Sequence, residues 1–194
     1  MGVEYELKFR ATAEKQAAIR AEIQGPEQEF DMQTTYYDAL DGGLSQRRYT
    51  LRRRLENGVS VCTLKTPSTG AGRGEWEVRC DSIEEAIEEL CKLGCPENLK
   101  ELTAGGIKQV CGAKFHRIAK TVQLADGIVE LALDQGILMG GGKEIPLCEV
   151  EVELKEGSPE MTHSYAIMLA ALYGLTPEKG SKFRRALALA KEEA

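Results

Sequence analysis

Hydrophobic and polar residues alternate over several short segments of the chain, beginning at its N-terminus. Between residues 3 and 9 the apolar Val3, Tyr5, Leu7 and Phe9 alternate with Glu4, Glu6 and Lys8. This period of two is typical of a β-strand and places the charged residues on one face and the apolar residues on the other. The pattern recurs over residues 51–55, 61–65, 75–77, 129–134 and 148–154. If the apolar faces pack under helices, the charged faces converge, and we expect a closed barrel with a charged lumen.

Capping residues divide the strands from a small number of helices. Thr12 begins a helix that ends near Gly25, Ser82 and Glu85 form a capping box, and Ser158-Pro159 begins a further helix. Ser181 caps a short final helix that carries Lys182 in its first turn. The dipeptide Asn57-Gly58 predicts a tight hairpin between two strands. Mixed strands and helices over 194 residues predict a single α+β domain, residues 1–194.

Composition and charge restrict the partners of this domain. The chain has 42% hydrophobic residues and a net charge of −6, so we expect neither nucleic acid nor an anionic membrane as a partner. It begins with a charged segment and has no apolar run approaching the ~18 residues of a membrane span, so we expect a cytoplasmic protein. Cys91 and Cys95 have no second ligand pair for zinc, which favours buried, reduced thiols.

The charged faces indicate a specific chemistry. Glu149, Glu151 and Glu153 lie ~6.6 Å apart along a strand, and such a row repels itself without cations. Because unpaired buried charges cost several kcal/mol each, the lumen must hold water, ions and a charged ligand. Carboxylates without histidine or cysteine suit Mg²⁺ or Mn²⁺, whereas arginine and lysine suit phosphate oxygens. We therefore predict a site for a metal-bound polyphosphate.

The order of the charged motifs resembles one family over essentially the whole chain. The motifs are Glu4-x-Glu6-x-Lys8, Tyr36-Tyr37-Asp38, Leu51-Arg52-Arg53-Arg54, Thr63-Leu64-Lys65, Glu75-x-Glu77, Glu130-Leu131-Ala132-Leu133-Asp134, Glu149-x-Glu151 and Lys182. In this order they resemble the CYTH superfamily, or triphosphate tunnel metalloenzymes, and most of all the bacterial inorganic triphosphatases. The resemblance implies an antiparallel eight-stranded β-barrel with helices packed outside. It also implies a Mg²⁺- or Mn²⁺-dependent hydrolase that cleaves inorganic triphosphate to pyrophosphate and phosphate with a metal-positioned water.

The resemblance also implies roles for individual residues. As metal ligands we expect Glu4, Glu6, Asp134, Glu149 and Glu151, with Glu153 extending the row. As substrate-binding residues we expect Lys8, Arg52, Arg54, Lys65, Glu75, Glu77, Arg117 and Lys182. As catalytic residues we expect Lys8, Tyr37 and Glu151; Tyr37 shares strand parity with Thr35 and so could enter the lumen. The family's second basic pair is matched by Arg117 but not by Phe115, which leaves Lys114 and Lys120 as substitutes.

Other functions remain open at this point. Related tunnels cleave thiamine triphosphate or convert ATP to cyclic AMP, as the class IV-type adenylyl cyclases do. A polyphosphate-binding domain without catalysis would keep the basic residues but would not need the carboxylate row, and a purely structural barrel would need neither. In every catalytic case the expected partner is a small-molecule triphosphate, and the domain is a monomer or a homodimer.

Overall fold

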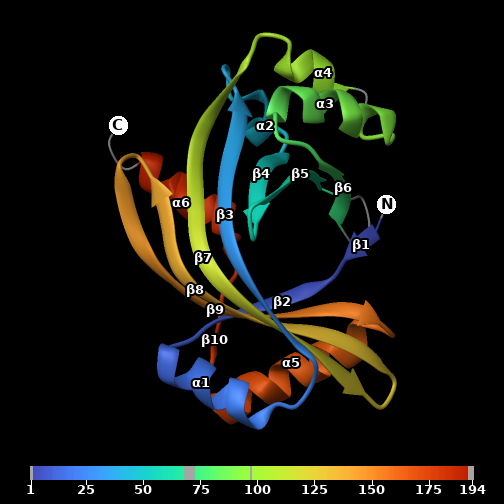
Figure 1. The fold of residues 1–194 in the computed structure, drawn as a ribbon, viewed down its shortest axis with the longest axis vertical. Coiled ribbons are helices and arrows are strands. Elements are labelled where there is room, and N and C mark those ends of the chain that lie inside the picture. Colours follow the sequence, from blue (N-terminus) through green and yellow to red (C-terminus); the bar gives the residue numbers. More distant parts are fainter. Residues whose placement is uncertain (1, 68–72, 97, 192–194) are drawn as a thin grey trace.

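A single antiparallel sheet organises the chain in the computed structural model, which describes residues 2–67, 73–96 and 98–191 (Figure 1). The strand order is β1-β6-β5-β4-β3-β7-β8-β9-β2-β10. The strands are β1 (Gly2–Glu4), β2 (Glu6–Arg10), β3 (Glu27–Ala39), β4 (Thr50–Glu56), β5 (Val59–Thr66), β6 (Arg73–Arg79), β7 (Ile107–Leu124), β8 (Gly127–Gly140), β9 (Lys143–Glu156) and β10 (Thr176–Pro177). The helices are α1 (Ala13–Glu22), α2 (Gly43–Gln46), α3 (Ile83–Lys92), α4 (Asn98–Thr103), α5 (Pro159–Tyr173) and α6 (Lys182–Lys191).

The N-terminal segment joins the two ends of this sheet. One residue, Tyr5, separates β1 from β2, yet β1 pairs with β6 and β2 pairs with β9. The Tyr5 carbonyl oxygen accepts a hydrogen bond from the Leu154 N–H at 2.9 Å, which continues the ladder across the break. If β1 and β2 are counted as one strand, that strand and β3 to β9 make eight strands around a tunnel. The predicted antiparallel eight-stranded barrel is thereby confirmed.

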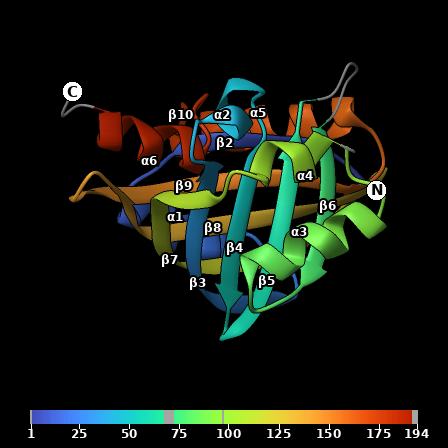
Figure 2. The ribbon, with the colours of Figure 1, turned by 90° about the horizontal axis from the view of Figure 1, so that it is seen from above.

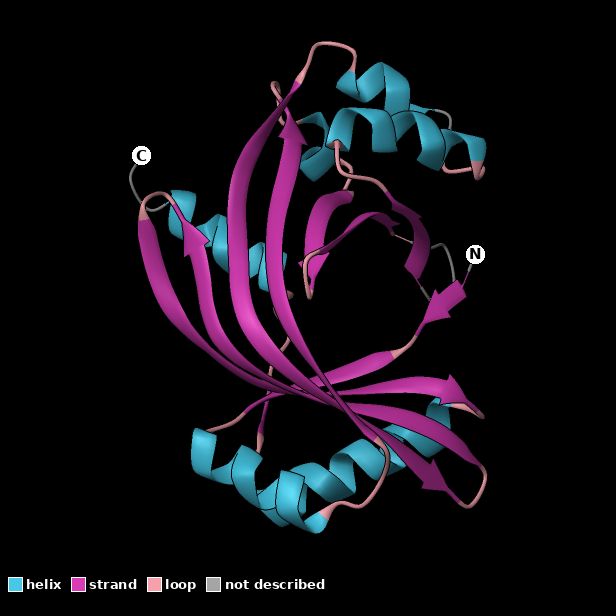
Figure 3. Cartoon of the chain, viewed as in Figure 1, coloured by secondary structure: helices cyan, strands magenta, loops and turns pink. Residues whose placement is uncertain are grey.

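Two pairs of helices cover the outer, apolar faces of the strands (Figure 3). Helices α1 and α5 cover β2, β8 and β9, where Ile19 and Leu169 pack with Leu131 and Val152. Helices α3 and α4 cover β4 and β5, where Leu90 and Leu99 pack with Leu51 and Leu64. The predicted caps are present: the side chains of Thr12, Ser82 and Ser158 each accept a hydrogen bond from the N–H three residues later. No helix in the described part of the chain is long and apolar enough to span a membrane.

Helix α6 packs differently from the other helices. Its Phe183, Ala186 and Leu189 contact Phe115 of β7 and Leu138 of β8. Phe115 lies two residues from Arg117 and therefore shares the charged face of β7. Figure 2 shows α6 at one end of the molecule. Its apolar side chains pack with Met32 of β3 as well as with Phe115 and Leu138. The interior is thus divided into an apolar end under α6 and a charged remainder.

The packing of α3 gives a prediction about stability. The Leu90 side chain is 0% exposed and belongs to the core under α3, whereas Leu93, at the end of the same helix, is 56% exposed. We expect Leu90→Ala to lower the free energy of unfolding by about 2–5 kcal/mol, because it removes buried contacts and leaves a cavity. Leu93→Ala is the matched control and should change this free energy by less than about 0.5 kcal/mol. Urea unfolding measures both, and equal losses for the two variants would contradict this packing.

Candidate active site

A charged cavity of about 630 Å³ lies inside the barrel. Seven cationic and six acidic residues line it, together with Thr34, Tyr36, Thr50, Trp76, Leu93, Phe115, Ser181 and Phe183. Ten of the residues expected from the sequence are among the lining: Glu6, Lys8, Arg52, Arg54, Lys65, Glu75, Glu77, Arg117, Glu151 and Lys182. The other charged lining residues are Glu130, Glu153 and Lys155. Strands far apart in the sequence therefore bring acids and bases into one space.

Tyr37 does not line this cavity, so the prediction that it enters the lumen is wrong. In the β3–β4 ladder Tyr37 lies opposite Leu51, and it packs in the apolar core under α3. Its neighbour Tyr36 lies opposite Arg52 and lines the cavity. The sequence here reads Thr-Thr-Tyr-Tyr, so the alternation does not indicate which tyrosine faces the lumen and which faces the helices.

The remaining expected residues lie elsewhere. Asp134 and Glu149 are 0% exposed and do not line the cavity. Both contact Lys182, which does line it. The side chain of Glu4 lies outside the described part of the structure. The Lys120 ammonium donates to the carbonyl oxygens of Arg20 and Ile23, at 2.7 and 2.9 Å, and is thus engaged outside the lumen.

Phe115 takes the place where a second base was expected. The Arg117 guanidinium carbon lies 5.8 Å from the centre of the Phe115 ring, and the Lys182 ammonium lies 5.2 Å from it. Both distances are within the range of cation–π attraction. Lys114 has the opposite strand parity and lines a separate cavity on β3, β7 and β8. Phe115 therefore contributes no positive charge of its own, and its ring instead attracts the neighbouring cations Arg117 and Lys182.

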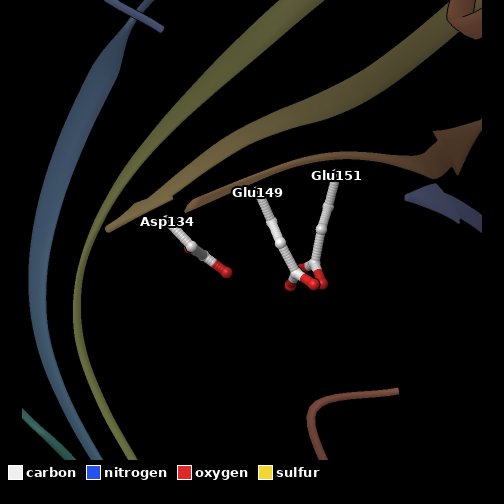
Figure 4. A group of neighbouring side chains, drawn as sticks. All are labelled: Asp134, Glu149 and Glu151. Atoms are coloured by element: carbon white, nitrogen blue, oxygen red, sulfur yellow. The ribbon is translucent and has the colours of Figure 1, made fainter. Parts of the chain in front are cut away.

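Lys182 lies in a buried cage of carboxylates. Its ammonium is 2.8 Å from Asp134 Oδ2, 2.7 Å from Glu149 Oε2 and 2.7 Å from Glu151 Oε1. Figure 4 shows the three carboxylates directed toward one another from neighbouring strands. Arg117 donates through Nε and Nη2 to the two oxygens of Asp134, at 2.7 and 2.8 Å, and Arg185 pairs with Glu149. Three acids and three bases thus neutralise one another at the barrel wall.

The cage shifts the pKa of Lys182, Glu151 and Glu149. Burial opposes the charged form of Lys182, but Asp134, Glu151 and Glu149 outweigh it and raise the Lys182 pKa. Burial likewise opposes the charged form of Glu151, but Lys182, Arg117 and Lys8 hold the Glu151 pKa well below its usual value. For Glu149 burial prevails over Lys182, and the pKa is raised. Of Glu149 and Glu151, Glu149 is therefore the acid that binds a proton more readily.

The opposite wall of the cavity holds arginines that lack full partners. Burial, followed by repulsion from Arg52, lowers the pKa of Arg54 to about 10. Within the described residues, the buried Nε atoms of Arg52 and Arg54 have no hydrogen-bond acceptor. Lys65 lies 3.3 Å from Glu75, which also approaches Arg52 at 4.0 Å. An anion with several oxygen atoms would satisfy both guanidinium groups.

The acidic cluster could hold a metal ion. One oxygen of each of Asp134, Glu149 and Glu151 lies within 4.8 Å of the others, and oxygen ligands suit hard divalent cations. Glu149 Oε2 is buried and, although 2.7 Å from the Lys182 ammonium, accepts no hydrogen bond of good geometry. The Lys182 ammonium, however, already lies among these oxygens, and of the three acids only Glu151 reaches the cavity.

A family model described as CYTH domain matches residues 2–187, nearly the whole described chain. The chain belongs to the CYTH domain family. This CYTH domain is 26% identical over 161 residues to an inorganic triphosphatase of Haemophilus influenzae. The match covers 82% of the chain but only 46% of that relative, so the chain spans about half of the relative's length.

Solved structures have the same fold as this CYTH domain. A protein of Pyrococcus horikoshii is 21% identical, with a TM-score of 0.66, and the match covers 98% of this chain and 99% of that one. A putative adenylyl cyclase of Hippeastrum, described as having a dominant triphosphatase activity, is 19% identical with a TM-score of 0.64. That match covers 100% of this chain and 96% of the other. At sequence identities of 21% and 19%, these similarities establish a shared fold and do not establish a shared activity.

The cage gives a prediction for the variant Lys182→Met. Removing the ammonium leaves three buried carboxylates short of a cation, so we expect a loss of about 3–5 kcal/mol in the free energy of unfolding at neutral pH. The double variant Lys182→Met/Glu149→Gln should recover part of this loss, because it also removes one uncompensated charge. Denaturant unfolding of the two variants and the original protein measures the difference.

The loss of stability in Lys182→Met should depend on pH in a defined direction. Without Lys182, burial raises the carboxylate pKa values in the folded state above the unfolded value of about 4.3. The loss in the free energy of unfolding is therefore complete at a pH above the raised pKa of the folded state. It disappears as the pH falls toward the carboxylate pKa of the unfolded state. The gap in stability between Lys182→Met and the original protein should narrow on acidification. A gap that stays constant or widens would show that buried carboxylates are not its cause.

Proposed function

We propose that this CYTH domain hydrolyses inorganic triphosphate to pyrophosphate and phosphate with Mg²⁺ or Mn²⁺. The observation that carries this proposal is the pair Arg52 and Arg54, whose buried Nε donors find no acceptor among the described residues. Lys8, Lys65 and Arg117 line the same cavity and add positive charge around them. A chain of phosphates offers many oxygen acceptors and a high negative charge, and it fits this arrangement better than a single carboxylate does.

Binding and electrostatics supply most of what phosphoryl transfer requires. Arg52, Arg54 and Lys65 hold phosphate oxygens on one wall. Arg117 and Lys182 attract them from the other wall, where the ammonium of Lys182 already faces three carboxylates. Both walls are fixed before the ligand binds, Arg117 and Lys182 by the carboxylate cage and Lys65 by Glu75. These cations can therefore stabilise the negative charge that develops on the leaving oxygen without a change in their own position.

The acids divide into two groups with different tasks. Glu6, Glu151 and Glu153 line the cavity and would hold the divalent ion, together with Glu4. When bound, this ion neutralises phosphate charge and lowers the pKa of water. Asp134 and Glu149 do not line the cavity and instead pair with Lys182 and Arg185. They would therefore position these cations, whereas the sequence led us to expect metal ligands.

Lys8 binds phosphate and does not act as a base. Burial opposes its charged form, but Glu6 and Glu151 outweigh burial and raise its pKa, so the ammonium keeps its proton. The proton released by the attacking water then goes to a carboxylate of the cavity. Glu151, the acceptor expected from the sequence, lies directly opposite Lys8 in the ladder, but Lys182 and Arg117 outweigh burial, lower its pKa and make it a weak base. Tyr36, whose hydroxyl remains neutral because burial raises its pKa, replaces Tyr37 as the tyrosine that can position an oxygen.

A second candidate function is hydrolysis or cyclisation of an organic triphosphate. Trp76 and Leu93 line the cavity and offer an apolar surface to a base or a thiazolium ring. The likeness to the Hippeastrum cyclase is compatible with this candidate. A polyphosphate-binding domain without catalysis is the third candidate.

A substrate comparison distinguishes these candidates. With Mg²⁺ or Mn²⁺ present we expect phosphate release from inorganic triphosphate to exceed release from thiamine triphosphate and ATP, and chelation of the metal should abolish it. Cyclic AMP as the main product from ATP would establish a cyclase instead. Tight binding of triphosphate without any turnover, measured by calorimetry, would support the binding domain.

Adjacent arginines test the assignment of the cavity wall. Arg54 lines the cavity, whereas Arg53 is directed away and donates through Nε to the Ser60 hydroxyl at 2.9 Å. We expect Arg54→Gln to lower kcat/KM for triphosphate by about 10- to 150-fold, the loss of one hydrogen bond to a charged group of ~1.5–3 kcal/mol. Arg53→Gln is the matched control and should stay within a few-fold of the original protein. Similar losses for both variants would mean that strand parity does not select the substrate contacts.

A further inference from the structure

Two cysteine thiols lie in contact at the C-terminal end of α3 (Figure 1). The Sγ atom of Cys95 lies 3.5 Å from the Sγ atom of Cys91 and is placed to donate its hydrogen to it. Three other free cysteines, Cys62, Cys80 and Cys111, donate to backbone carbonyl oxygens instead. Cys91 and Cys95 are therefore a candidate dithiol site.

The backbone at the end of α3 holds these two thiols together. Gly94 has a φ of 77°, the left-handed conformation with which helices commonly end. The Gly94 N–H donates to the Cys91 carbonyl oxygen at 3.0 Å, and the Cys95 N–H donates to the Leu90 carbonyl oxygen at 3.2 Å. This pair of hydrogen bonds is a Schellman motif, which turns the chain back over the last turn of the helix. The spacing of the two thiols is thus set by backbone hydrogen bonds.

The two thiols differ in exposure and in acidity. Cys91 is half-buried, whereas the side chain of Cys95 is only 5% exposed. Burial, followed by the hydrogen bond to Cys91, raises the pKa of Cys95 to about 12. Because the thiolate is the nucleophile in thiol–disulfide exchange, Cys91 reacts first with a reagent from solution and Cys95 reacts second.

We propose that Cys91 and Cys95 form a modification site that a small disulfide, such as oxidised glutathione, converts to an intramolecular disulfide. The Cys91 thiolate attacks one sulfur of the reagent, whose S–S bond breaks and releases one thiolate. The sulfur of Cys95 then attacks the sulfur of Cys91, forms the new S–S bond and releases the second thiolate. The two cysteines are oxidised, and the reagent is reduced to two thiols that take up the two protons. The sulfur atoms must approach each other by about 1.5 Å for this bond to form.

The disulfide would fix a part of the barrel cavity wall. Leu93 lies between the two cysteines in the sequence and lines the charged cavity. A bond between Cys91 and Cys95 closes a short loop that contains Leu93. Such a bond stabilises a protein mainly because it restricts the unfolded chain. We therefore expect the oxidised protein to be the more stable form.

Tryptic digestion detects the proposed bond, because trypsin cleaves between the two cysteines. Cleavage after Arg79, Lys92 and Lys100 yields the peptides 80–92 and 93–100, which the disulfide would join. The reduced protein is incubated with oxidised glutathione, alkylated, digested without reductant and analysed by mass spectrometry. We expect the joined peptides and no glutathione adduct on either of them, and dithiothreitol should separate the two.

Single variants test the order of the two steps. Cys95→Ser should keep a glutathione adduct on Cys91, because no second thiol displaces it, and Cys91→Ser should give neither product. Cys80 lies in the same tryptic peptide as Cys91, so Cys80→Ser should still form the joined peptides. Cys148→Ser is the matched control, since Cys148 is a half-buried cysteine of β9, and it should react as the original protein does.

Thermal unfolding tests whether the bond fixes the loop around Leu93. We expect oxidation to raise the unfolding midpoint of the original protein by about 2–8 °C and to give no such rise in Cys95→Ser. A glutathione adduct without joined peptides, or no reaction at Cys91, would overturn the proposal. So would a midpoint that stays constant or falls when the disulfide forms. None of these measurements uses phosphate hydrolysis, so their outcome is independent of the proposed function.

Discussion

The ion pairs between Lys182 and the acids Asp134, Glu149 and Glu151 are the interaction on which the tunnel depends. Charges removed from water cost several kcal/mol each unless partners of opposite sign and good geometry surround them. The partners here come from four elements, because β8 and β9 supply the acids, β7 supplies Arg117, and the start of α6 supplies Lys182. The cage therefore fixes α6 against the inner face of the barrel, at the boundary between its apolar end and its wet end. Without that helix Glu149 would lose Lys182 and Arg185, and Asp134 and Glu151 would lose Lys182.

The same requirement of charge pairing explains why the cavity is prepared for an anion. On the wall of the cage every acid has a cation, so its arginine and lysine are held in position. On the opposite wall Arg52 and Arg54 lie close enough for the first to lower the pKa of the second, and their buried Nε donors find no acceptor in the described part of the protein. Both walls are thus positioned before the ligand enters, and one of them offers two buried guanidinium N–H donors that have no acceptor among the described residues. That argument favours a polyphosphate over a neutral ligand.

Much of the fold and most of the cavity lining follow from the alternation in the sequence, because each strand buries one face and so fixes which residues share the other. This reasoning predicted that Arg52, Arg54, Lys65 and Arg117 face the lumen, and all four line the cavity. It failed where the pattern is degenerate: the Thr-Thr-Tyr-Tyr run does not reveal whether Tyr36 or Tyr37 faces inward, and only pairing with β4 decides it. It also could not show that Asp134 and Glu149 serve a lysine from α6, since that contact depends on how a distant helix docks. The unfavourable first-turn position of Lys182 was a clue to a nearby anion, but the anion is part of the protein.

Closure of the barrel through Tyr5 has a consequence for the metal. It places β2 beside β9 in the register that sets Lys8 opposite Glu151 and Glu6 opposite Glu153. Like charges directly opposite on neighbouring strands are destabilising. Glu6 pairs with Lys8 at 2.6 Å and Glu153 pairs with Lys155 at 2.9 Å, so a lysine lies beside each acid. A divalent cation between these acids would relieve both at once and release the two lysines for phosphate oxygens. In the proposed function this register would couple metal binding to substrate binding, because a metal ion that neutralised the carboxylates would leave Lys8 to the phosphates.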